Sequence, residues 1–138
     1  KSEKAQTVTI DLVEVRMDEQ KSWFCSHMFI RNRLWFGKTV AVMNSEWMGP
    51  WRVAPRAHPN DGKVDIVEGT LPFGQRLIAR QRIRTGDHIP HPKIKVSQRS
   101  AWATTTEHPN NVYLDGHKVG KFKAIELQVL PDALTVVF

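Results

Sequence analysis

Apolar and polar residues alternate along most of the chain, which is the pattern expected of β-strands with one buried face. The alternation is clearest in residues 7–16, where a break in phase at Leu12-Val13 indicates a β-bulge. Runs of β-branched and aromatic residues predict further strands at 22–31, 38–44, 63–69, 92–98, 100–106, 111–114, 124–130 and 133–138. Turn-forming pairs separate most of these strands, at Asp61-Gly62, Asn110-Asn111, Asp115-Gly116 and Pro131-Asp132.

One segment does not follow the strand pattern. Residues 72–84 lack alternation and contain good helix formers, so they predict a helix that is capped at its C-terminal end by Gly86. A chain of about nine short strands and one helix points to an antiparallel sandwich or barrel. Residues 1–6 form a frayed polar lead-in, and residues 7–138 are expected to form a single domain.

The composition is that of a folded globular protein, but the charge is unbalanced. The formal net charge is +6 and the sequence pI is near 9.8. This surplus favours an anionic partner, such as a lipid headgroup surface, a nucleic acid or a phosphorylated small molecule, although it also serves solubility alone. Cys25 is the only cysteine, which excludes an intramolecular disulfide.

The sequence contains neither a membrane-spanning apolar run nor a secretory signal, so we expect a cytoplasmic protein. Because the chain starts at Lys1 instead of methionine, it is expected to be a processed product or a piece of a longer protein.

The predicted helix carries basic and apolar side chains on the same wedge. At helical spacing, Phe73 and Leu77 lie beside Arg76, Arg80 and Arg84. This arrangement is compatible with contact to an anionic membrane surface, where the arginines reach the headgroups. The alternative is that the arginine stems cover a core helix and leave their guanidinium groups in water.

Several other motifs are less informative. The glycines are too widely spaced for a phosphate-binding loop, so we do not expect the chain alone to bind ATP. His88 and His91 are flanked by prolines that forbid a metal-binding helix. Trp47 and Trp51 belong either to a stacking or lipid-contact platform or, more commonly, to a core.

The segment HPNDGKVD, residues 58–65, places Asp61 in a tight turn. There its carboxylate and the neighbouring carbonyls could converge on a hard cation, since magnesium and calcium both take oxygen ligands. An Asp-Gly turn by itself is usually only a turn.

The order of these segments resembles the C-terminal domain of the diacylglycerol kinase family, which includes bacterial lipid kinases and the sphingosine and ceramide kinases. The resemblance covers roughly residues 40–138 and rests on ordered blocks at Asn44, Gly49, 51–69, 82–94, 112–120 and 127–137. It implies a mainly β fold, an antiparallel β-sandwich that forms half of a two-domain lipid kinase. In the family, the other half carries a Gly-Gly-Asp-Gly-Thr nucleotide motif, which this sequence lacks.

The resemblance also implies two sites. The family's magnesium-binding aspartate corresponds to Asp61, with the carbonyls of His58 and Lys63 as further ligands. The family reads Leu-Asp-Gly-Glu where this chain reads Leu114-Asp115-Gly116-His117, so the general-base glutamate is replaced by His117. Neutral imidazole is also a suitable base, but the change removes a negative charge beside magnesium and phosphates.

A second departure from the family is WMGPWRVAP, residues 47–55, where the family has a run of glycines. If that glycine run lets the backbone approach the substrate, Pro50 and Trp51 close the approach.

We therefore expect the lipid-substrate domain of a diacylglycerol-kinase-like enzyme, which phosphorylates a lipid hydroxyl only when a separate nucleotide-binding domain supplies ATP. The expected partners are that domain and a lipid or anionic membrane surface, to which the protein is peripheral, and the isolated chain is expected to be inactive. The alternative is a stand-alone pseudokinase that binds anionic lipid or another protein. A nucleic-acid partner is not expected, because the sequence has no RNP-like motif or aromatic ladder.

Overall fold

The computed structural model describes residues 4–31, 38–48, 50–70, 82–86 and 94–138. Within these residues the chain is mainly β, as the sequence predicts. The strands are β1 (Thr7–Met17), β2 (Gln20–Phe24), β3 (His27–Arg31), β4 (Thr39–Met43), β5 (Trp47–Met48), β6 (Trp51–Arg52), β7 (Val64–Gly69), β8 (Ile94–Arg99), β9 (Ala101–Leu114) and β10 (His117–Val137).

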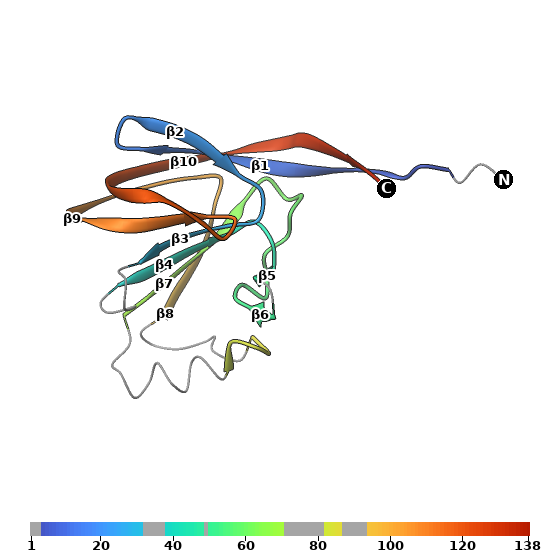
Figure 1. Cartoon of the computed structure of the whole chain (residues 1–138). Helices are drawn as coiled ribbons and strands as arrows, with labels where there is room; N and C mark the ends of the chain where they lie inside the picture. The colour runs from blue at the N-terminus through green and yellow to red at the C-terminus, as the bar shows by residue number, and fades with distance from the viewer. Residues whose placement is uncertain (1–3, 32–37, 49, 71–81, 87–93) are drawn as a thin grey trace.

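Eight of these strands form one antiparallel sheet, in the order β2-β1-β10-β9-β3-β4-β7-β8, and β5 pairs with β6. Figure 1 shows that β2, β1 and β10 lie in one layer and that β4, β7 and β8 lie in the facing layer. The predicted antiparallel sandwich is confirmed, and its two layers are parts of the same folded-over sheet.

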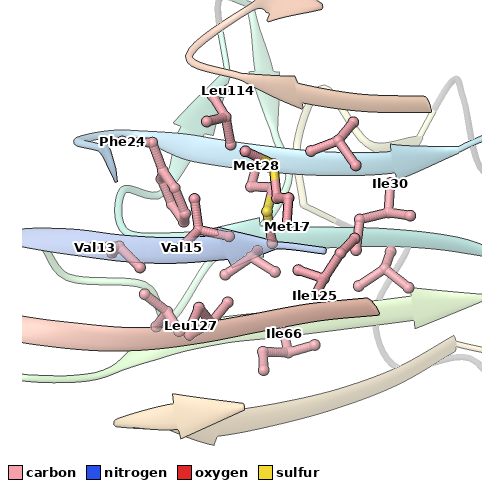
Figure 2. Packing of buried hydrophobic residues seen from close by; sticks show 14 of the residues in the cluster. Val13, Val15, Met17, Phe24, Met28, Ile30, Ile66, Leu114, Ile125 and Leu127 are labelled. Carbon is pink, nitrogen blue, oxygen red and sulfur yellow. The ribbon is translucent and has the colours of Figure 1, made fainter. Parts of the chain in front are cut away.

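The main hydrophobic core lies between these layers. It contains alternate residues of β1, β3 and β7, such as Val13, Met28 and Ile66, together with apolar residues of β10 such as Ile125 and Leu127 (Figure 2). A second cluster covers the opposite face of β3, β4 and β7, where Phe29, Met43 and other residues pack against the segment 53–57. The central strands are therefore buried on both faces, which explains why they read as apolar runs instead of clean alternation.

The predicted strand boundaries are wrong at three places. Residues 22–31 form two strands, because the chain bends at Cys25 and Ser26. Conversely, β9 and β10 continue through the predicted turns at Asn110-Asn111 and Pro131-Asp132. Asn110 and Asn111 pair regularly with Phe122 and Lys121, whereas Pro131 and Asp132 lie in a bulge. On β9, residues 106–109 lie opposite Lys123 alone, and on β10, residues 131–133 lie opposite Asp11 alone.

The outer halves of β1 and β10 extend beyond the sandwich as a two-stranded ribbon (Figure 1). At its end, Gln6 and Phe138 exchange two backbone hydrogen bonds of 2.8 and 2.9 Å. Val8 and Val136 face each other on this ribbon and are exposed.

The predicted helix at 72–84 lies almost entirely outside the described residues. Its described end, residues 82–86, is a turn in which the Thr85 amide donates to the Arg82 carbonyl. Gly86 has a φ of +80°, as expected of a glycine at the end of such a turn.

Candidate functional site

The Asp115-Gly116 turn joins β9 to β10 as a tight hairpin. Leu114 pairs directly with His117, so the loop has only two residues. Asp115 has a φ of +47° and Gly116 a φ of +87°. Positive φ at both positions is typical of the type I′ turn, whose twist matches that of the strands. The hairpin that the sequence predicts is therefore confirmed.

The Asp115 carboxylate fixes the bend between β2 and β3. It accepts hydrogen bonds from the backbone N–H groups of Cys25 (2.9 Å), Ser26 (2.7 Å) and His27 (3.0 Å). In return, the Asp115 amide donates to the His27 carbonyl at 2.9 Å. Because these donors occupy the carboxylate, Asp115 serves as a structural anchor and holds the turn rigidly against β3.

His117 lies immediately after this turn, at the first position of β10, and its side chain is exposed. Among the described residues, its imidazole has no hydrogen-bond or ionic partner. The structure therefore places an accessible imidazole on a well-anchored turn, which is a suitable position for a group that must reach a substrate.

Sequence reasoning missed a second histidine beside the same turn. His27 is half-buried, with Nδ1 3.1 Å from Ser26 Oγ and its ring edge-to-face with Phe29. Burial lowers the pKa of His27, and the nearby Asp115 carboxylate opposes this shift. Ser26 Oγ in turn lies 2.9 Å from Ser45 Oγ. No local signal separated His27 from an ordinary strand residue, since Asp115 and Ser45, which complete its surroundings, come from distant segments.

The loop at residues 58–63 is held in place by Asp11, which is fully buried. Asp11 accepts the Gly62 amide at 2.6 Å through Oδ2, and its own amide donates to the Pro59 carbonyl at 2.8 Å. Asp61 is exposed, and its Oδ1 accepts the Lys63 amide at 2.9 Å. The loop thus presents an exposed carboxylate from a rigid backbone.

The Asp61 carboxylate and the main-chain carbonyls of its loop are oxygen ligands of the kind that a hard cation takes. In the described part of the chain, no group of three or more His, Cys, Asp or Glu side chains could hold a metal ion. A cation here would therefore depend on Asp61 and on carbonyl ligands such as those of His58 and Lys63.

Asp65, four residues further on, is a second group that the sequence did not indicate. It is buried on β7, where Oδ1 accepts a hydrogen bond from Gln98 Nε2 at 3.1 Å and Oδ2 has no hydrogen-bond partner among the described residues. The pKa of Asp65 is raised overall, mainly by burial and also by the Asp61 charge. The Gln98 hydrogen bond and the Arg56 charge act in the opposite direction.

The β5–β6 hairpin presents one exposed aromatic residue. Met48 and Trp51 pack against the second cluster, whereas Trp47 lies opposite Arg52 and is 47% exposed. Arg52 is paired with Glu46, and its amide donates to the Ile83 carbonyl at 2.9 Å. This bond places the exposed Arg82 and Arg84 beside the hairpin. Arg76, Arg80, His88 and His91 lie outside the described residues.

Among the residues that the structure describes, no helix is long and apolar enough to span a membrane.

The family model of the YegS C-terminal NAD kinase β-sandwich-like domain matches residues 6–138. The chain belongs to this family. The resemblance to the C-terminal domain of diacylglycerol-kinase-like proteins is thus confirmed, and it extends over the first strands as well as residues 40–138.

Solved structures agree with this YegS-type domain. Two structures from Bacillus anthracis str. Sterne that carry the name diacylglycerol kinase superpose with TM-scores of 0.71 and 0.65. Their sequence identities to this chain are 15% and 16%, so the likeness establishes the fold. The matches cover 94% of this chain but 56% and 53% of those chains, so this chain spans a little over half of their length. A comparison with curated proteins gives no match.

Proposed function

We propose that this YegS-type domain is the lipid-substrate half of a diacylglycerol-kinase-like enzyme. The enzyme would phosphorylate a lipid hydroxyl when a separate nucleotide-binding domain supplies ATP. The observation that carries the proposal is the anchored Asp115-Gly116 turn, which presents an exposed His117 where the resembling family has its glutamate base.

In this function His117 accepts the proton of the lipid hydroxyl. A neutral imidazole has the nitrogen lone pair that this step needs. The rigid turn limits the positions that the ring can occupy, which favours a productive approach to the hydroxyl. ATP would supply the transferred phosphoryl group, and its magnesium ion would neutralise the charge of the phosphates.

The loop at 58–63 has a supporting task in the proposal. Asp61 and the carbonyls of His58 and Lys63 would hold Mg²⁺, which suits these oxygen donors. Such an ion would stabilise the loop that Asp11 already ties to β1.

The test is phosphoryl transfer by the native polypeptide that carries this sequence, with ATP and diacylglycerol in mixed micelles. We expect His117→Ala to lower kcat by about 10²- to 10⁴-fold, the usual contribution of a general base, with little change in the lipid KM. His117→Glu should restore much of the activity. His108→Ala is the control, because His108 is an exposed histidine on β9 outside the turn.

Full activity of His117→Ala would remove His117 from the reaction. Absence of transfer to any lipid hydroxyl by the wild-type polypeptide would overturn the proposed activity itself.

A second candidate function, a non-catalytic module that binds anionic lipid, is favoured by the β5–β6 hairpin. Trp47 is exposed there, next to Arg82 and Arg84, and tryptophan with arginine suits the boundary between headgroups and acyl chains.

Co-sedimentation with phosphatidylglycerol and phosphatidylcholine vesicles tests this second function. We expect binding to the anionic vesicles only, and an Arg82→Gln, Arg84→Gln double variant should bind about 30-fold more weakly, at roughly 1 kcal/mol for each arginine. Trp47→Ala should also weaken binding. Trp23→Ala is the matched control, since Trp23 is 49% exposed on the distant strand β2. Equal loss in the Trp47 and Trp23 variants would overturn the hairpin as the contact, and phosphoryl transfer would exclude a purely non-catalytic role.

A further inference from the structure

Two segments that are far apart in the sequence are joined through one buried side chain. These are the loop at 58–63, which carries Asp61, and the turn at 115–116, which precedes His117. We infer that Asn44 is a positioning residue whose side-chain amide fixes the His117 turn relative to the Asp61 loop. The consequence for phosphoryl transfer rests on the proposed function, whereas the mechanical link itself does not.

The loop side of the link is formed by Asp11 at the β1 bulge. Its carboxylate accepts the Gly62 amide at 2.6 Å and the Asp132 amide at 2.9 Å, and its own amide donates to the Pro59 carbonyl. Asp11 is fully buried, and both of its carboxylate oxygens accept hydrogen bonds. Movement of the loop must therefore displace the backbone of Asp11 as well.

Asn44 continues the link at the end of β4. Its Nδ2 donates to the Asp11 carbonyl at 2.8 Å and to the Cys25 carbonyl at 2.9 Å, so both amide hydrogens bridge separate segments. Its own backbone amide donates to the Ser26 carbonyl at 2.8 Å. Asn44 is fully buried, and within the part of the chain that the structure describes its Oδ1 has no hydrogen-bond partner. A buried side-chain oxygen without a hydrogen bond costs free energy. The two hydrogen bonds that Nδ2 donates offset this cost, and they explain why an amide is suited to this position.

The turn side begins in the peptide unit between Cys25 and Ser26. The carbonyl of this unit accepts Asn44 Nδ2, and its N–H donates to Asp115 Oδ1 at 2.7 Å. A peptide unit is planar and stiff, so Asn44 and Asp115 are hydrogen-bonded to the carbonyl and the N–H of the same rigid unit. Rotation of this peptide unit would move the Asp115 anchor, and with it His117, two residues further along the chain.

Amide hydrogen exchange on the wild-type polypeptide and a double-mutant cycle test this link without ATP or lipid. Asp11→Asn weakens the loop side, and we expect the Ser26 and His27 amides then to exchange about fivefold to tenfold faster, the equivalent of one lost hydrogen bond. In the Asn44→Ser background, where the short side chain cannot bridge both carbonyls, Asp11→Asn should change these rates by less than about twofold. Amides of central β10 report global unfolding, and their rates are used to normalise the others.

Asn111→Ser is the matched control. Asn111 is another buried asparagine whose Oδ1 has no hydrogen-bond partner in the described residues, but it lies on β9 and makes none of the bonds of this link. The Asn111→Ser background should preserve the full effect of Asp11→Asn at Ser26. Equal effects of Asp11→Asn in the wild-type and Asn44→Ser backgrounds would overturn the inference. If Asn44→Ser does not fold, Asn44→Leu, which keeps the side-chain volume but removes both donors, takes its place in the same cycle.

Discussion

Asp115, within the hairpin turn, and His27, beside it, have different tasks. Asp115 has its carboxylate filled by backbone N–H donors, which makes it part of the framework. His27 is half-buried against Phe29 and Ser26, and burial lowers its pKa. Protonation of His27 therefore opposes folding, because the unfolded chain binds the proton more readily.

This difference predicts a pH dependence of stability. The ordinary pKa of histidine is 6.5, and that of His27 is lower in the folded protein. The contribution of His27 to stability should therefore be constant above pH 6.5. It should fall as the pH drops from 6.5 towards the lower pKa of His27 in the folded protein. Urea denaturation at pH 7.5, 6.5 and 5.5 measures this, and His27→Gln should flatten the slope below pH 6.5. His108→Gln is the exposed control. Parallel curves for wild type and His27→Gln would contradict the prediction.

The bulge in the β1–β10 ladder shows how a single irregular position fixes two other segments, the loop at 58–63 and residues 131–133. The sequence predicted an irregularity at Leu12-Val13, and the ladder places it one residue earlier, at Asp11. There the carboxylate binds the amides of Gly62 and Asp132, and Asp132 takes a positive φ of 52°. The bulge thus determines where the Asp61 loop and residues 131–133 of β10 lie.

Replacement of Asp11 by asparagine should be costly for its size. The new NH₂ group would face a backbone N–H, so one buried donor loses its acceptor, and we expect the free energy of unfolding to fall by about 2–3 kcal/mol. Urea denaturation measures this change. Thr9→Val removes one hydrogen bond to Asp132 at an exposed position and should cost less than about 1 kcal/mol. Similar losses in the two variants would show that the Asp11 bonds are not special.

Stability of the molecule as a whole depends on the cluster between the two layers of the folded-over sheet. Ile66 lies in this cluster and is 0% exposed, while its neighbour Val67 packs into the second cluster on the other face. By contrast, the ribbon formed by the outer halves of β1 and β10 carries exposed valines outside both clusters.

Truncations at these two places should differ strongly. Ile66→Ala leaves a cavity that the surrounding strands cannot close, so it should lower the free energy of unfolding by about 2–5 kcal/mol. Val8→Ala on the ribbon should change it by less than about 0.5 kcal/mol. Chemical denaturation of both variants checks the contrast, which would fail if Val8→Ala were as destabilising as Ile66→Ala.

Local pattern was sufficient for the class of fold and for the hairpin. Alternation and β-branched content identified most strands, and Asp115-Gly116 formed a turn because both residues tolerate a positive φ. The family resemblance indicated His117 and Asp61 as site residues, and their chemical roles stay predictions. Turn propensity failed at Asn110-Asn111, which pair regularly with β10, and at Pro131-Asp132, which lie in a bulge of the β1–β10 ladder. At both places, pairing with the neighbouring strand outweighs the local preference.

By itself, then, the sequence determined a basic, mainly β domain with a tight turn before His117, since these properties follow from composition and from contacts between near neighbours. Only the tertiary structure decided where the 22–31 segment breaks, because that bend depends on Asp115, about ninety residues away along the chain. It also decided the task of Asn44, whose partners Asp11 and Cys25 are distant in sequence. Hydrogen bonds of this kind leave no periodic trace, because each needs one donor and one acceptor that only the folded sheet brings together.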